Sequence, residues 1–177
     1  MGVWKLLPEF IEGSVAASDA DGLSELLREV TARMGFDYYA LTHHVDLEGS
    51  PGTTIRLHNY PAQWVEYFDL HGLAATDPIH RASQRSASGF VWRHVPRMIP
   101  LTRRDLQILS LAQAHGIGDG VTIPANVPGE ATGSCSFAYS TGATLSPPSL
   151  AAAQVVGTFA FESARRLWQV RGAVQGG

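Results

Sequence analysis

Apolar residues recur every three or four positions along much of the chain, the spacing that gathers side chains on one face of a helix. The clearest stripe contains Leu23, Leu27 and Val30, and Gly35 shortly after it is typical of a helix end. Pro8 interrupts the pattern near the N-terminus, so the first helix is expected to be short or irregular. The spacing predicts helices over residues 4–15, 21–34, 61–71, 102–115 and 149–170.

Other segments carry aromatic and β-branched residues between turn-forming residues, which predicts strands. The first two are separated by turn-rich sequence at 46–52 and the last two by residues 125–132, so each pair is expected to form a hairpin. Hairpins favour an antiparallel sheet, and helices before, between and after them favour cover on both faces. We therefore predict an α+β fold, an α-β-α sandwich around about five strands at 36–45, 53–58, 89–92, 116–124 and 133–140.

Three helix starts carry recognisable capping residues. Thr102 with Asp105 three residues later resembles a capping box. Asn59 is expected near the cap of the helix that contains Trp64. Thr76 or Asp77 is expected to cap a short helix, with Pro78 tolerated in its first turn.

Composition fits one ordered globular domain of 177 residues, with 45% hydrophobic and 16% charged residues. No run approaches the roughly 18 to 20 apolar residues that cross a bilayer, so no membrane association is expected. The net charge of -3 argues against binding of nucleic acid by this chain alone. A single cysteine, Cys135, and the lack of a secretory signal favour a cytoplasmic location.

An aromatic stripe followed by a carboxylate is the most informative stretch for function. Tyr60, Trp64 and Phe68 are four residues apart and share one helix face. Such a stripe is more often core than ligand site, and Asp77 alone reads as a helix cap. A capping carboxylate can also face a pocket, so the stretch is interpreted as one wall of a small-molecule site.

The spacing of these residues resembles a known family. NYPxxW is followed by Asp-Pro thirteen residues after Trp64, by Trp92 fifteen residues after Asp77, and then by GxTxP from Gly120. This pattern is similar to the autoinducer-binding domain of LuxR-type quorum-sensing transcriptional regulators, over nearly the whole chain. The resemblance implies a five-stranded antiparallel sheet between helical layers, with an N-acyl-homoserine lactone buried against the sheet.

The resemblance also implies roles for individual side chains. Trp64 would donate to the lactone carbonyl, and Asp77 would accept from the ligand amide N–H. Tyr60 and Ser136 would donate to the amide carbonyl, and Trp92 would line the lactone end. The ligand-site set implied in this way is Tyr60, Trp64, Phe68, Asp77, Pro78, Trp92 and Ser136, with structural roles for Pro78 and Gly120.

Two departures from the family pattern carry expectations of their own. Phe68 replaces the tyrosine usual at that position, so we expect a shifted acyl-chain preference. The family usually continues into a helix-turn-helix domain, which this sequence lacks, so we expect part of a longer regulator that reaches DNA only through that domain. Residues 1–172 are assigned to the binding domain and 173–177 to a flexible end, and a homodimer is expected by resemblance.

Two other classes of function remain open from the residues alone. One is a lactone- or amide-hydrolysing enzyme that uses Cys135 or a histidine-bound metal. No HExxH or paired Cys-His spacing is present, and the adjacent His43 and His44 would point to opposite strand faces, so neither metal nor enzymatic activity is expected. The other is a sensor of the GAF or PAS kind with a different ligand. No cofactor beyond the lactone ligand is expected.

Overall fold

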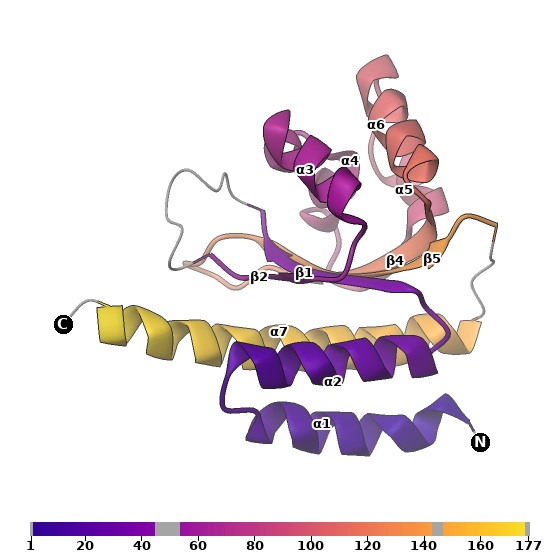
Figure 1. Ribbon diagram of the computed structural model, residues 1–177. Coiled ribbons are helices and arrows are strands. Elements are labelled where there is room, and N and C mark those ends of the chain that lie inside the picture. The colour runs from indigo at the N-terminus through magenta and orange to yellow at the C-terminus, as the bar shows by residue number, and fades with distance from the viewer. Residues whose placement is uncertain (1, 45–53, 143–146, 176–177) are drawn as a thin grey trace.

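The computed structural model describes residues 2–44, 54–142 and 147–175 and has an antiparallel sheet at its centre (Figure 1). Within these residues the sheet has five strands in the order β2-β1-β5-β4-β3. The predicted α+β sandwich is confirmed, whereas the predicted turn at 46–52 lies outside the described residues. The strands are β1 Tyr38–His43, β2 Arg56–His58, β3 Phe90–Val91, β4 Ile117–Ala125 and β5 Gly133–Ser140.

Helices cover both faces of the sheet (Figure 1). On one face, α2 (Ala20–Arg33) and α7 (Pro147–Gln175) lie next to the strands, and α1 (Leu6–Ala16) packs outside them. The other face carries α3 Ala62–Leu70, α4 Pro78–Ser83, α5 Val95–Met98 and α6 Arg103–Ala114, with 3-10 turns at Leu73–Ala75 and Trp92–His94. A further 3-10 turn, Val3–Lys5, precedes α1 on the first face.

The last helix is longer than its sequence pattern predicts. Its backbone runs through Gln175, so residues 173–175 of the predicted flexible end continue α7, while 176–177 lie outside the described residues. No helix in the described ranges is long and apolar enough to cross a membrane.

Strand alternation separates two interiors, one on each face of the sheet. Leu41 of β1 and Phe137 of β5 are fully buried against α2 and α7 in the larger core. Ser136, the neighbour of Phe137, belongs to the opposite face, where smaller clusters form around Trp64 and around Val95. This second face holds the cavity described below.

Most of the predicted helix starts are confirmed, and one is wrong. Thr102 and Asp105 form a capping box at α6, and Asp77 caps α4. Asn59 does not cap α3, because that helix begins after Pro61. The Asn59 side chain instead ties β1 to the following segment, since its Oδ1 accepts from the Tyr39 N–H at 2.7 Å.

The third strand is shorter than expected. It ends at Val91, and Trp92 begins a 3-10 turn rather than extending the strand to 92. The turn brings the Trp92 indole back over β4, where it packs against Gly120.

Candidate functional site

A cavity of about 490 Å³ lies between the sheet and the layer of α3, α4, α5 and α6. Its floor is the sheet face that looks away from α7, and its roof comes from the helices. Six of the predicted site residues line it together, although they span 77 positions in the sequence from 60 to 136. These are Tyr60, Trp64, Phe68, Asp77, Trp92 and Ser136.

Trp64 and Phe68 of α3 form part of the roof. The predicted stripe of three is wrong for Tyr60, which also lines the cavity but lies before α3 begins at Ala62 and so does not share its face. Trp64 is 5% exposed, and the Phe68 ring meets it edge-on at 5.9 Å between centroids. Burial, and secondarily the charge of Asp77, raise the pKa of the Tyr60 phenol, which therefore stays protonated and able to donate. Neither the Tyr60 hydroxyl nor the Trp64 indole N–H has a hydrogen-bond partner among the described residues, so both donors are available to a guest.

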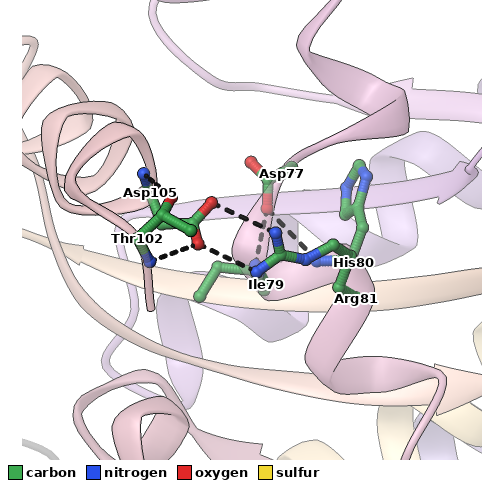
Figure 2. A network of polar contacts seen from close by, with 6 residues as sticks. All are labelled: Asp77, Ile79, His80, Arg81, Thr102 and Asp105. Atoms are coloured by element: carbon green, nitrogen blue, oxygen red, sulfur yellow. Dashed lines mark hydrogen bonds and ion pairs between the residues drawn. The ribbon is translucent and has the colours of Figure 1, made fainter. Parts of the chain in front are cut away.

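One carboxylate oxygen of Asp77 caps α4, and the other is available to the cavity. Its Oδ1 accepts from the backbone N–H of Ile79 at 2.7 Å and of His80 at 3.1 Å, while Oδ2 makes no hydrogen bond within the described residues (Figure 2). The residue as a whole is only 7% exposed. A buried oxygen that only accepts is suited to a ligand N–H. Pro78 does not line the cavity and takes the first position of α4, where no N–H is needed.

An ion pair that is buried at Asp105 and partly exposed at Arg81 joins α4 to α6 (Figure 2). Both terminal nitrogens of Arg81 donate to Asp105, at 3.2 and 3.0 Å. Asp105 is 2% exposed and also accepts from the Thr102 N–H at 2.9 Å, so it completes the capping box at the same time. The pair therefore fixes the short helix that carries Asp77 relative to the rest of the roof.

The floor contains a chain of polar contacts that ends at Trp92. The Trp92 indole N–H donates to Thr122 Oγ1 at 2.8 Å, and Thr122 Oγ1 lies 2.7 Å from Ser136 Oγ. Trp92 thus uses its only donor on the protein and offers a guest its ring face. Ser136 keeps hydrogen-bonding capacity because a hydroxyl has one donor and two acceptor sites.

Gly120 allows Trp92 to approach the sheet. A Cβ at this position would lie 2.7 Å from the Phe137 carbonyl oxygen and 3.0 Å from two atoms of the Trp92 ring. Contacts this short force neighbouring groups apart.

Gly120→Ala is therefore expected to destabilise the fold by about 1–3 kcal/mol and to displace Trp92. Urea unfolding measures the first effect, and tryptophan emission the second. Gly2→Ala is the matched control, since its added Cβ would have no neighbour closer than 4.0 Å. Equal stability of the Gly120 variant and the native chain would contradict this account.

Sequence reasoning missed a polar group at one end of the cavity. The His44 ring stacks on His80 with centroids 3.8 Å apart, and its Nε2 lies 2.7 Å from Ser134 Oγ. Burial, and secondarily the neighbouring His80 and His43, lower the pKa of His44 to about 2. His80 and Ser134 line the cavity. Their sequence spacing could have indicated this, because His80 lies about one helical turn after Asp77 and Ser134 lies two strand positions before Ser136.

This burial of His44 predicts a dependence of stability on pH. The unfolded chain takes up a proton at His44 below its ordinary pKa of 6.5, whereas the folded chain does not. The free energy of unfolding is therefore highest above pH 6.5 and decreases as the pH falls below that value. The decrease due to His44 approaches about 1.4 kcal/mol per pH unit.

Urea unfolding from pH 7.5 to 5 measures this slope. His44→Phe keeps a ring for the stack on His80 and removes the titrating group, so its stability should fall less steeply over the same range. Parallel curves for the two proteins would refute the assignment to His44.

Cys135, the candidate nucleophile of a hydrolase, lies away from the cavity. Cys135 is fully buried on the α7 side of the sheet, and burial raises the pKa of its thiol. His43 packs edge-on against Phe161 of α7, while its neighbour His44 stacks on α4, so the two histidines do point to opposite faces. Within the described ranges no three histidine, cysteine or acidic side chains gather in a cluster that could hold a metal ion.

A cavity with aromatic walls and a few inward donors and acceptors between a sheet and a helical layer is typical of α-β-α domains that bind a small molecule. The family model for the autoinducer-binding domain matches residues 19–164, and the chain belongs to this family. The match covers the whole cavity wall and confirms the resemblance that the motif spacing indicated.

Individual relatives agree with this assignment. The transcriptional activator protein AhyR of Aeromonas hydrophila is 25% identical over 132 residues, which are 74% of this chain and 51% of AhyR. The chain thus spans about half the length of that relative. Escherichia coli SdiA in complex with octanoyl-rac-glycerol has the same fold, with a TM-score of 0.71, 22% identity and coverage of 93% of this chain and 66% of SdiA.

The LuxR-family transcription factor CepR2 of Burkholderia cenocepacia, described as N-acylhomoserine lactone dependent, also shares the fold. Its TM-score is 0.70 at 14% identity, with coverage of 97% of this chain and 98% of CepR2.

Proposed function

We propose that this chain is the sensing domain of a quorum-sensing transcriptional regulator and binds an N-acyl-homoserine lactone in the cavity. The single observation that carries the proposal is the pairing of a free acceptor, Asp77 Oδ2, with the free donors of Tyr60 and Trp64 on one cavity wall. Such a ligand presents one amide N–H and two carbonyl oxygens. A buried amide needs both its donor and its acceptor satisfied, and this wall provides partners of each kind.

The printed ligands of structural relatives are compatible with this assignment. SdiA is described with octanoyl-rac-glycerol and CepR2 as dependent on N-acylhomoserine lactone, and both compounds join an acyl chain to a small polar head. In the proposed pose Ser136 joins Tyr60 at the amide carbonyl and Trp92 covers the lactone ring. Phe68 offers the acyl chain an apolar surface. No cofactor and no catalytic step are required.

Ligand binding is expected to raise the melting temperature as the ligand concentration increases. At a hundred times the Kd, the free energy of unfolding should increase by about 2.7 kcal/mol. Melting scans with N-octanoyl-homoserine lactone measure it. The ring-opened N-octanoyl-homoserine is the matched control, because it keeps the amide and the chain but places a carboxylate where the lactone carbonyl would meet Trp64.

No rise across a series from butanoyl to dodecanoyl lactone would count against the proposal. Mass spectrometry of the released ligand separates a sensor from a hydrolase. Intact lactone is the expected result, and ring-opened or cleaved product that accumulates with turnover would identify an enzyme.

We further propose that the ligand-bound domain forms a homodimer and controls DNA binding by a helix-turn-helix domain in the complete regulator. The relatives support this proposal, since AhyR is a transcriptional activator and RhlR is an HTH-type quorum-sensing regulator. Because such regulators act on DNA within the cell, we place this domain in the cytoplasm.

A further inference from the structure

The cavity has a second polar group beyond the proposed amide site. Ser134 follows the same face of β5 as Ser136, two residues away, which corresponds to about 7 Å along a strand. Thr42 of β1 is its direct neighbour in the strand register. We call Thr42, His44, His80 and Ser134 the distal polar cluster; three of them, Thr42, His80 and Ser134, line the cavity.

Internal contacts fix the orientation of this cluster. The His80 Nδ1 lies 3.1 Å from the carbonyl oxygen of Ala74, which can only accept, so Nδ1 carries the hydrogen and Nε2 of the neutral ring is an acceptor. His44 bridges the helical roof and the floor, because it stacks on His80 and hydrogen-bonds Ser134. The cluster is therefore a joined unit of α4 and the sheet.

Its hydrogen-bonding capacity is not used up by the protein. Neither His80 Nε2 nor Thr42 Oγ1 has a hydrogen-bond partner in the part of the chain that the structure describes. Ser134 has one contact, to His44, out of the three that a hydroxyl can make. An alkyl end buried here would displace water from these polar groups without forming hydrogen bonds to them, which weakens binding.

We infer that the ligand carries a hydrogen-bonding group, such as a hydroxyl, at the far end of its acyl chain, where it contacts His80 and Ser134. The inference rests on the proposed function, which places the amide at Asp77 and Ser136. Two extended residues cover about 7 Å with six backbone bonds, so the polar group lies about six bonds from the amide carbonyl carbon.

Two lactones of equal chain length test the inference by isothermal titration. N-(6-hydroxyhexanoyl)-homoserine lactone ends in oxygen six bonds from the carbonyl carbon, and N-heptanoyl-homoserine lactone ends there in a methyl group. Hydrophobic transfer alone favours the methyl compound. The native chain is expected to bind the hydroxyl compound about tenfold more tightly. The site can form hydrogen bonds with the hydroxyl group, whereas the methyl group would leave the polar groups of the site without partners.

The variant His80→Phe/Ser134→Ala should reverse this preference and still bind the heptanoyl compound, which shows that it is folded. Ser134→Ala alone is the milder variant and should lose part of the preference. If the native chain binds heptanoyl lactone as well as or better than the hydroxyl compound, the inference is wrong and the proposed function stands. If the native chain binds neither lactone nor any of the butanoyl to dodecanoyl series, the proposed function fails as well.

Discussion

Asp77→Asn is expected to weaken lactone binding about 100-fold or more while the domain stays folded. Asparagine caps helices as well as aspartate, so its oxygen can replace Oδ1 at the N–H groups of Ile79 and His80. The cavity then receives an NH₂ group in place of Oδ2. Two donors would face each other where the ligand presents its N–H, and lost charge-assisted bonding plus an unpaired buried group together cost about 3–4 kcal/mol.

A second aspartate cap provides the control for this substitution. Asp19 caps α2 on the other side of the sheet and accepts from the Gly22 N–H at 2.7 Å. Asp19→Asn changes the same chemical group far from the cavity and should leave affinity unchanged. Titration of both variants, with melting scans to check the fold, decides the matter. Native-like affinity in Asp77→Asn would remove Asp77 from the ligand site.

Asp105→Ala is expected to cost about 1–3 kcal/mol of folding stability, because the buried carboxylate loses its hydrogen bonds to Arg81 and Thr102. The change removes two hydrogen bonds from Arg81 and the half of the capping box in which the Asp105 carboxylate accepts from the Thr102 N–H. The other half remains, because the backbone N–H of residue 105 still donates to Thr102 Oγ1. It also frees α4 from α6, so ligand affinity should fall although Asp105 does not line the cavity.

Denaturant unfolding and lactone titration of the same variant separate the two effects. Glu29→Ala is the control, because its pair with Arg33 is exposed at 68% and 49% of the side chains and is worth little. A loss below about 0.5 kcal/mol for Asp105→Ala would show that the pair contributes no more than an exposed one.

Much of the fold was predictable because its signals are local. The stripe through Leu23 and Leu27, the capping box at Thr102 and the aromatic spacing around Trp64 each depend on residues close in sequence. Asn59 was predicted wrongly because its side chain serves a partner twenty residues away, the Tyr39 N–H. A cap preference cannot reveal such a long-range bond.

The candidate site was predictable for residues within a motif and not for those that the fold brings together. Tyr60, Trp64 and Asp77 stood out by spacing, and the cavity contains all three. His44 and Ser134 are ninety residues apart and meet only because β1 pairs with β5. No local pattern indicates that a histidine at a strand end will stack on another from a helix.

The shared carboxylate of Asp77 has a consequence for the energetics of recognition. Its two hydrogen bonds to the start of α4 restrict its rotamers independently of any ligand. The conformational entropy of that side chain is therefore lost during folding and not at the moment of binding. A ligand amide therefore meets an acceptor that is already oriented. Discrimination among ligands then depends on how well each ligand matches this fixed acceptor, and not on a rearrangement of the protein.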